Sequence, residues 1–143
     1  MTTLLAPAPA RRRSERVRAP LLTITGLAAA TTALHYRDPH VSGSWGFCPS
    51  AALGFWCPGC GGLRAVHDLT DADVAAAASS NLLLVVLAPI AVVALVAWLV
   101  LRWRGSQARP PRSVVLVGGW VLLVATGAFT LLRNTPAAPW LAP

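Results

Sequence analysis

The chain has 143 residues, of which 55% are hydrophobic and 12% are charged, and its formal net charge is +7. Such a composition excludes an ordinary soluble globular domain and favours a single membrane domain. The positive charge does not indicate nucleic-acid binding, because it lies in short segments beside long apolar runs, where it suits lipid head groups. We therefore expect membrane lipids as partners and no nucleic acid.

The first predicted elements are a basic tail, residues 1–16, and a transmembrane helix over residues 17–36. The strictly apolar part of this helix, residues 21–34, is short for a bilayer, so the helix spans only if Arg18 reaches out to the head groups. A basic start, a short apolar run and small residues also fit a cleaved signal peptide. We favour a retained helix, and under either interpretation the segment that follows is exported.

The next segment, residues 37–81, changes along its length from a turn-rich loop to short helices. Prolines and glycines interrupt residues 38–59, which predicts irregular structure there. After Cys60 the apolar residues recur at helical spacing, and the acidic residues within 70–73 predict a second helix start. We expect these short helices to lie along the membrane surface.

Two uncharged runs of twenty residues, 82–101 and 113–132, are long enough to cross a bilayer of about 30 Å at about 1.5 Å per residue. Pro89 lies inside the first run and predicts a kink there, since it removes one backbone donor. Small residues on the last helix, including Gly118 and Ala125, would allow close packing within the chain, with a second copy or with another membrane protein.

Arginine placement predicts the orientation, because cytoplasmic loops carry the excess of positive charge. Nine of the twelve arginines lie near the start of the first span or between the second and third spans. Residues 37–81 hold two arginines against four aspartates. We therefore predict an all-α, multi-pass protein of the inner (plasma) membrane, with residues 17–143 as one membrane domain. Its amino terminus faces the cytoplasm, and the cysteine loop and carboxyl terminus face outward.

All three cysteines fall in the outward segment, within "CPSAALGFWCPGCGGLRA", and three interpretations stay open. A disulfide from Cys48 to Cys57 or Cys60 would order the loop and leave one thiol. The CPGC motif precedes a helix start, which lowers a cysteine pKa, so thiol–disulfide exchange would use Cys57 as the attacking thiol and Cys60 as the resolving thiol. With His67 the three thiolates would form a tetrahedral zinc set by ligand type, although the spacing is not that of a double zinc knuckle.

Two arginines outside the basic segments allow more than one interpretation. Arg64 could bind an anion or pair with Asp68 four residues later. Arg133 follows the third span, where it could cap the last helix carbonyls or pair with the acidic loop.

No serine–histidine–aspartate set, phosphate-binding glycine loop or intramembrane charge indicates an enzyme or an ion pathway, and nothing indicates a cofactor or a small-molecule substrate. We predict a small accessory or partner-binding membrane protein whose outer loop is ordered by its cysteines. The alternatives are a membrane-tethered thiol–disulfide exchange protein and a zinc-binding membrane module.

The segments "CPGCGGLRA", "SSNLLLVV" and "LLRNTP" resemble a bacterial family of small membrane proteins, classed as a domain of unknown function, with a CP-x-CG-x-TRA signature. Cys48 matches an upstream cysteine of that family, whereas Leu63 stands where the family usually has threonine or serine. The other matching residues are Cys57, Pro58, Cys60, Gly61, Arg64, Ala65, Asn81, Arg133 and Asn134. The resemblance covers residues 48–136, and it implies an integral membrane protein with the cysteine loop as its functional centre, without choosing between redox and structural roles.

Overall fold

The computed structural model describes residues 13–41, 43–45, 48–106 and 108–142, so residues 1–12 of the predicted basic tail lie outside the described residues. The described part of the chain is built from helices and turns. Its elements are α1 (Arg13–Tyr36), α2 (Pro49–Ala52), α3 (Gly62–Thr70), α4 (Val74–Trp103), α5 (Arg112–Arg133) and a short 3-10 helix, η1 (Pro139–Leu141). The all-α prediction is confirmed.

Three of these helices, α1, α4 and α5, are long and apolar enough to cross a membrane, as predicted. Their large side chains are largely exposed, for example Val93 at 68% and Leu123 at 60%. Exposure on this scale would be costly in water, but it is the state required of a helix that faces lipid. The protein is therefore a multi-pass membrane protein.

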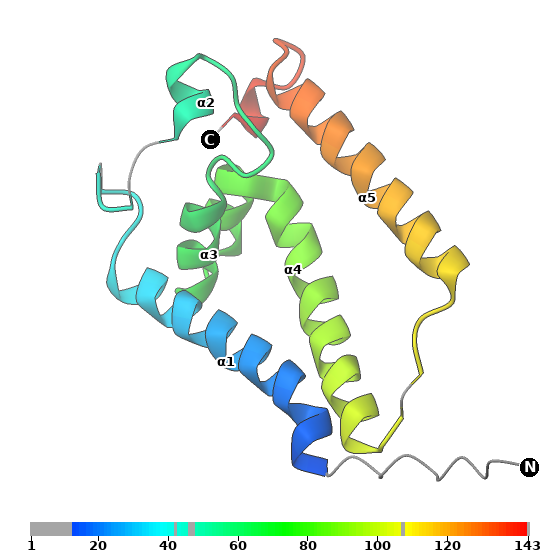
Figure 1. The fold of residues 1–143 in the computed structure, drawn as a ribbon. Coiled ribbons are helices and arrows are strands. Elements are labelled where there is room, and N and C mark those ends of the chain that lie inside the picture. Colours follow the sequence, from blue (N-terminus) through cyan, green and yellow to red (C-terminus); the bar gives the residue numbers. More distant parts are fainter. Residues whose placement is uncertain (1–12, 42, 46–47, 107, 143) are drawn as a thin grey trace, which may run out of the picture.

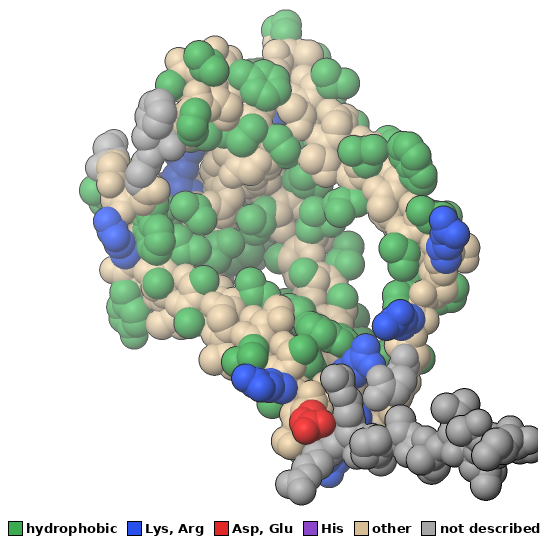
Figure 2. Space-filling view, viewed as in Figure 1, with side chains coloured by type: hydrophobic (Ala, Val, Ile, Leu, Met, Phe, Trp, Pro, Cys, Tyr) green, Lys and Arg blue, Asp and Glu red, His purple; other side chains and the backbone are tan. Residues whose placement is uncertain are grey.

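The three long helices are arranged as an open set (Figure 1). Helices α1 and α4 converge where α1 starts and α4 ends, and α5 leans away from α4. The carboxyl-terminal η1 contacts both α4 and α5 at the opposite end of the molecule. Hydrophobic side chains are spread over all three helices, whereas arginines gather where α1 and α4 converge (Figure 2).

Helix α4 changes direction at Asn81, whose backbone angles (φ −161°, ψ 93°) are not helical. The Asn81 Oδ1 accepts the backbone N–H of Leu84 at 3.0 Å, which caps the membrane-spanning part of the helix. The first part of α4 has its own cap, since Asp73 accepts the N–H of Ala76 at 2.9 Å. The non-helical bend thus lies at Asn81, whereas Pro89, where the sequence predicts a kink, lies inside the helix.

Helix α3 packs on the first part of α4, and two small residues of these helices are fully buried. Ala65 and Ala77, one from each helix, are 0% exposed. Gly62 is also buried, and a Cβ there would make an ordinary contact with the Leu84 side chain at 3.5 Å. Small residues therefore let α3 dock directly beside the Asn81 bend and bring the cysteine loop to it.

The Asn81 bend predicts a specific sensitivity to mutation. Asn81→Ala removes the cap and two hydrogen bonds from Nδ2 to the carbonyls of Pro58 and Cys60, so the free energy of unfolding should fall by about 2–3 kcal/mol. Pro89→Ala is the matched control on the same helix and should leave stability unchanged or slightly raised. Unfolding in detergent measures both, and an equal loss in the two variants would contradict this account of the bend.

Candidate functional site

The loop that carries the cysteines is attached to the far end of the chain through Asn134. The Asn134 Nδ2 donates to the Trp56 carbonyl at 2.8 Å, and the Trp56 N–H donates back to the Asn134 Oδ1 at 2.8 Å. A side-chain amide thus pairs with the Trp56 backbone as a neighbouring strand would. These two bonds join positions 78 residues apart in the sequence.

Two further side chains, those of Arg133 and Asn81, donate hydrogen bonds to the backbone carbonyls of the CPGC turn. Arg133 is 2% exposed, and its Nη1 donates to the carbonyls of Cys57 at 2.9 Å and Cys60 at 3.2 Å. Asn81, also 2% exposed, donates to the carbonyls of Pro58 at 2.9 Å and Cys60 at 3.1 Å. Buried carbonyls need hydrogen-bond partners, and here the ends of two membrane helices supply them. The loop therefore takes its shape from α4 and α5.

The CPGC segment itself is a tight turn that leads into α3. The Cys60 N–H donates to the Cys57 carbonyl at 3.0 Å, and the Gly62 N–H donates to the Gly59 carbonyl at 2.9 Å. Gly61 precedes α3 with φ +76°, a conformation that favours glycine. The turn brings the Cys57 and Cys60 sulfurs to 3.2 Å.

The third cysteine reaches this turn from the start of α2. The Cys48 Sγ lies 3.4 Å from the Cys60 Sγ, and the three sulfurs all lie within 4.8 Å of one another. The Ser50 hydroxyl lies 3.2 Å from the Cys48 Sγ and 3.5 Å from the Cys60 Sγ. All three cysteines are free thiols. We call Cys48, Cys57 and Cys60 the thiol cluster.

The members of the thiol cluster differ in acidity. Hydrogen bonding to the Ser50 hydroxyl, to the Ala51 backbone and to Cys60 lowers the pKa of Cys48 to about 7. The nearby Ser50 hydroxyl and the Cys60 thiol also lower the pKa of Cys57. Burial instead raises the pKa of Cys60. At neutral pH the Cys48 sulfur thus carries thiolate character and the Cys60 sulfur holds its proton, and the lowered pKa of Cys57 favours its thiolate.

The thiol cluster opens into a surface groove of about 600 Å³. Its opposite walls come from the segment before α2 and from the start of α3, and they include Pro39, His40, Val41, Trp45, Leu63 and Arg64. Cys48 is exposed and Cys57 is half-buried, whereas Cys60 is 6% exposed. A partner that enters the groove would therefore meet the two more acidic thiols first.

The other motif residues have identifiable places. Ala65 is buried against α4, and the Pro58 carbonyl accepts from Asn81. Arg64 lines the groove. Asp68, which the sequence offered as a partner for Arg64, is 6% exposed and bonds instead to the Ser80 Oγ at 3.0 Å.

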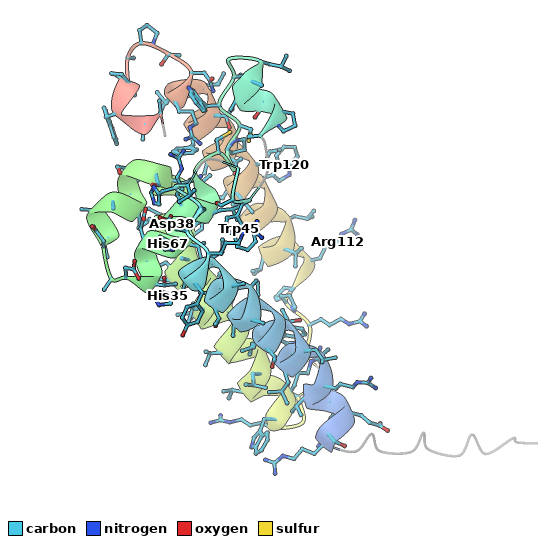
Figure 3. All side chains as sticks on the ribbon, turned by 90° about the vertical axis from the view of Figure 1, so that its left-hand side faces the viewer. His35, Asp38, Trp45, His67, Arg112 and Trp120 are labelled. Carbon is cyan, nitrogen blue, oxygen red and sulfur yellow. The ribbon has the colours of Figure 1, made fainter. Side chains whose placement is uncertain are left out.

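The three histidines form a second cluster, with aspartates, which the sequence did not lead us to expect. His35, His67 and Asp38 of this cluster are labelled in Figure 3. The His40 Nε2 lies 2.8 Å from the Asp68 Oδ1. His67 contacts the Leu34 carbonyl through Nδ1 at 2.9 Å, and its Nε2 lies 3.7 Å from Asp38. These contacts join the end of α1 and the following loop to α3. They also place His67 apart from the three sulfurs, with which it was grouped as a possible zinc ligand.

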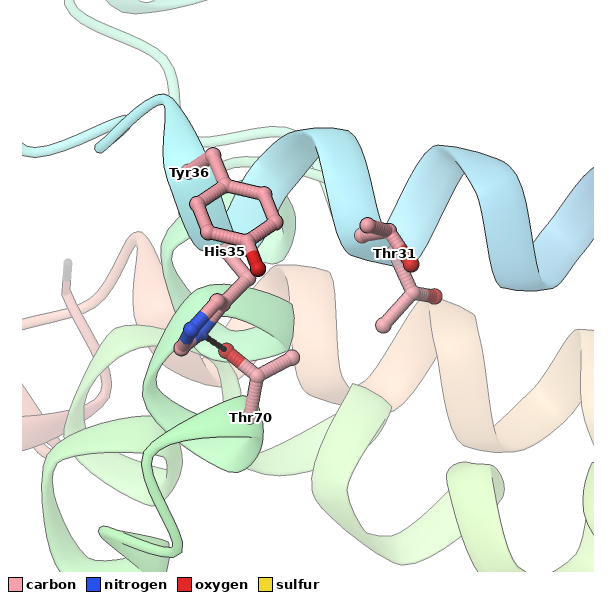
Figure 4. A pocket seen from close by; sticks show the side chains of 5 residues that line it. Thr31, His35, Tyr36 and Thr70 are labelled. Atoms are coloured by element: carbon pink, nitrogen blue, oxygen red, sulfur yellow. Dashed lines mark hydrogen bonds between the residues drawn. The ribbon is translucent and has the colours of Figure 1, made fainter.

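His35 completes this second cluster. Its Nδ1 lies 2.9 Å from the Thr70 hydroxyl (Figure 4) and 3.1 Å from an Asp71 oxygen. The side-chain hydrogen bonds from the three histidines to Thr70, Asp68 and the Leu34 carbonyl cross 28 to 35 residues of sequence. Because no local spacing pattern marks such pairs, the sequence alone gave no signal for the cluster.

Comparison with known proteins finds one family. The model of a family described as a protein of unknown function (DUF2752) matches residues 48–95, from Cys48 through the thiol cluster into the membrane-spanning part of α4. No curated protein matches the chain, and no solved structure does. The resemblance to a family of unknown function is thus shown for this segment, and Arg133 and Asn134 lie outside it.

The acidity of Cys48 predicts its reactivity. Alkylation of Cys48 in the reduced protein should be half-maximal near pH 7, because the thiolate is the reacting form and its fraction falls below the pKa. Ser50→Ala should move that midpoint up toward the ordinary value of about 8.5. Peptide mapping of labelled protein across pH 5–10 measures Cys48 and Cys60 in one sample. A Cys48 midpoint at or above that of Cys60 would contradict the assignment.

Proposed function

We propose that the protein is a membrane-anchored thiol–disulfide exchange protein. The observation that carries this proposal is the central position of Cys60, whose sulfur lies 3.2 Å from Cys57 and 3.4 Å from Cys48. A disulfide requires sulfurs about 2.05 Å apart, so a small side-chain movement would join Cys60 to either neighbour. One buried thiol can therefore resolve a bond formed at either of two accessible thiols.

The pKa values of the three cysteines suit the proposed roles of attacking and resolving thiol. An attacking thiol works best with a pKa near the ambient pH, which is where Cys48 lies and toward which the pKa of Cys57 is lowered. A resolving thiol needs access to the mixed disulfide rather than to solvent, and Cys60 is buried between the other two. The gradient from exposed thiolate to buried thiol supports exchange rather than inert packing.

The proposed reaction is a reversible two-electron exchange with a disulfide-bearing protein. The Cys57 thiolate attacks one sulfur of the partner disulfide, the partner S–S bond breaks, and the second partner sulfur leaves as a thiolate that takes up a proton. Cys60 then loses its proton and attacks the Cys57 sulfur, which forms the Cys57–Cys60 bond and releases the first partner sulfur as a thiol. Cys48 can attack Cys60 in turn, which moves the bond to Cys48–Cys60 and frees Cys57.

The predicted role of the cysteines in ordering the loop has weaker support. Hydrogen bonds from Asn81, Arg133 and Asn134 already satisfy four carbonyls of the loop, those of residues 56, 57, 58 and 60. A loop with this many long-range contacts does not depend on a disulfide for its shape. The accessory or partner-binding role remains compatible with exchange, because a protein substrate is itself a partner that must dock in the groove.

The distribution of charge supports an outward-facing thiol cluster. Arginines gather where α1 starts and α4 ends (Figure 2), whereas the CPGC turn is hydrogen-bonded to Asn81, near the other end of α4. Under the positive-inside rule the arginine-rich end belongs in the cytoplasm and the thiol cluster outside the plasma membrane, in an oxidising compartment.

A second candidate function is binding of a thiophilic metal ion. Three sulfurs within 4.8 Å of one another are the observation that favours it. Zinc would take the three thiolates and one further ligand from water or a partner, since His67 lies in the other cluster. Zinc would need all three thiols deprotonated at the same time, whereas exchange needs one thiolate at a time, including Cys60 when it resolves the mixed disulfide.

Trapping of an intermediate tests the exchange proposal. Cys60→Ser removes the resolving thiol, so mixed disulfides with membrane or exported proteins should accumulate on Cys57 or Cys48. Non-reducing electrophoresis of native membranes, followed by peptide mapping, measures them. The matched control is the variant with all three cysteines changed to serine, which should form none.

Two results would overturn the proposal. One is a Cys60→Ser variant that folds, as judged by its elution as a single species in detergent, and yet gives no more mixed disulfide than the triple-serine control. The other is roughly one zinc ion per chain in the purified wild-type protein that disappears in Cys48→Ser, which would establish the metal site instead.

A further inference from the structure

We propose that the arginine-rich end of the protein binds the phosphate of an anionic phospholipid. A pocket of about 250 Å³ lies there between α1, the end of α4 and the loop that follows. Its charged and aromatic lining residues are Glu15, Arg16, Trp98, Arg102 and Arg109. We call this the arginine pocket.

The charge of the arginine pocket requires an anion. Three guanidinium groups line it against one carboxylate, and one of the three, that of Arg102, also donates to the Ser106 carbonyl. Like charges gathered in a hollow repel one another, and the repulsion is screened less there than on an open surface. A phosphate diester would neutralise the excess and can accept paired N–H groups from a guanidinium.

Among the arginines that line the pocket, Arg16 has a buried hydrogen-bond donor without an acceptor in the described part of the chain. Its Nε is buried and has no hydrogen-bond partner among the described residues. Its guanidinium lies against Gly105, where a Cβ would come within 3.0 Å of Nη1, and Gly105 has φ +84°. A glycine in a conformation that favours glycine thus makes room for this guanidinium. A buried donor without an acceptor is costly, and a phosphate oxygen in the arginine pocket would supply one.

The position of the pocket favours a lipid over a soluble phosphate. Arg16 lies near the start of one spanning helix and Arg102 near the end of another, so the arginines stand at the depth of the head groups. Trp98 lines the pocket and Trp103 lies one turn beyond, packed under the Arg13 guanidinium at 3.7 Å. Tryptophan and arginine together are typical of the membrane interface. The apolar faces of both helices continue from the pocket and would lie along the acyl chains.

Native mass spectrometry of the full chain in detergent tests this site. The wild-type protein should bind phosphatidylglycerol about tenfold more tightly than phosphatidylcholine, because only the former brings net negative charge to the pocket. Arg16→Gln with Arg109→Gln should abolish the preference. The matched control, Arg18→Gln with Arg112→Gln, removes two arginines of the same end that do not line the pocket and should keep it.

A charge-conserving variant and competition by inorganic phosphate complete the test of the lipid site. Arg16→Lys with Arg109→Lys keeps the charge and should retain part of the preference, which separates loss of the site from loss of the fold. The proposal is wrong if the pocket variant and the control lose the preference equally, or if phosphatidylcholine binds as tightly as phosphatidylglycerol. Inorganic phosphate should compete only weakly. If it binds alone as tightly as the lipid does, the ligand is a soluble oxyanion and the lipid assignment fails.

Discussion

The buried guanidinium of Arg133 is the contact on which the arrangement of this protein depends. It stands at the last residue of a membrane-spanning helix and donates to the carbonyls of Cys57 and Cys60. A charged side chain that is 2% exposed is costly to bury unless it is hydrogen-bonded. Here the loop backbone provides acceptors for Nη1, whereas Nε and Nη2 have no partner among the described residues. The same contact joins α5, which leans away from α4, to the cysteine loop.

Asn81 and Asn134 also donate hydrogen bonds from their side chains to backbone carbonyls of the cysteine loop. Asn81 interrupts α4, and its side-chain amide contacts both the helix and the loop. Its Oδ1 caps the membrane-spanning part of α4, and its Nδ2 donates to a carbonyl of the CPGC turn. Asn134 pairs with the backbone of Trp56. Hydrogen bonds from helix ends thus give the loop its shape, and the sulfurs remain free thiols that face a groove. Rigid support around the three sulfurs would suit the proposed exchange chemistry.

How much of this was visible in the sequence differs from element to element. Uncharged runs of twenty residues predicted the second and third spans because length and apolarity alone decide such helices. The spacing of Cys57 and Cys60 made them neighbours in any turn, but the approach of Cys48 across twelve residues to Cys60 depends on where α2 begins. Proline is a strong local signal, so a bend was expected at Pro89, whereas the bend at Asn81 depends on carbonyls more than twenty residues away. The contacts of the histidines and of Arg133 are likewise tertiary, and no local pattern encodes them.

The central claim is that side-chain hydrogen bonds, and not the cysteines, hold the loop to the membrane helices. The most direct measurement compares the unfolding of two variants in detergent without reductant. Arg133→Met removes the two donated bonds at similar side-chain size, and the other variant changes Cys48, Cys57 and Cys60 to serine. We expect the first to lower the free energy of unfolding by about 3 kcal/mol and the second by less than about 1 kcal/mol. A larger loss in the triple-serine variant, on the scale of a missing disulfide at about 2–4 kcal/mol, would contradict the account.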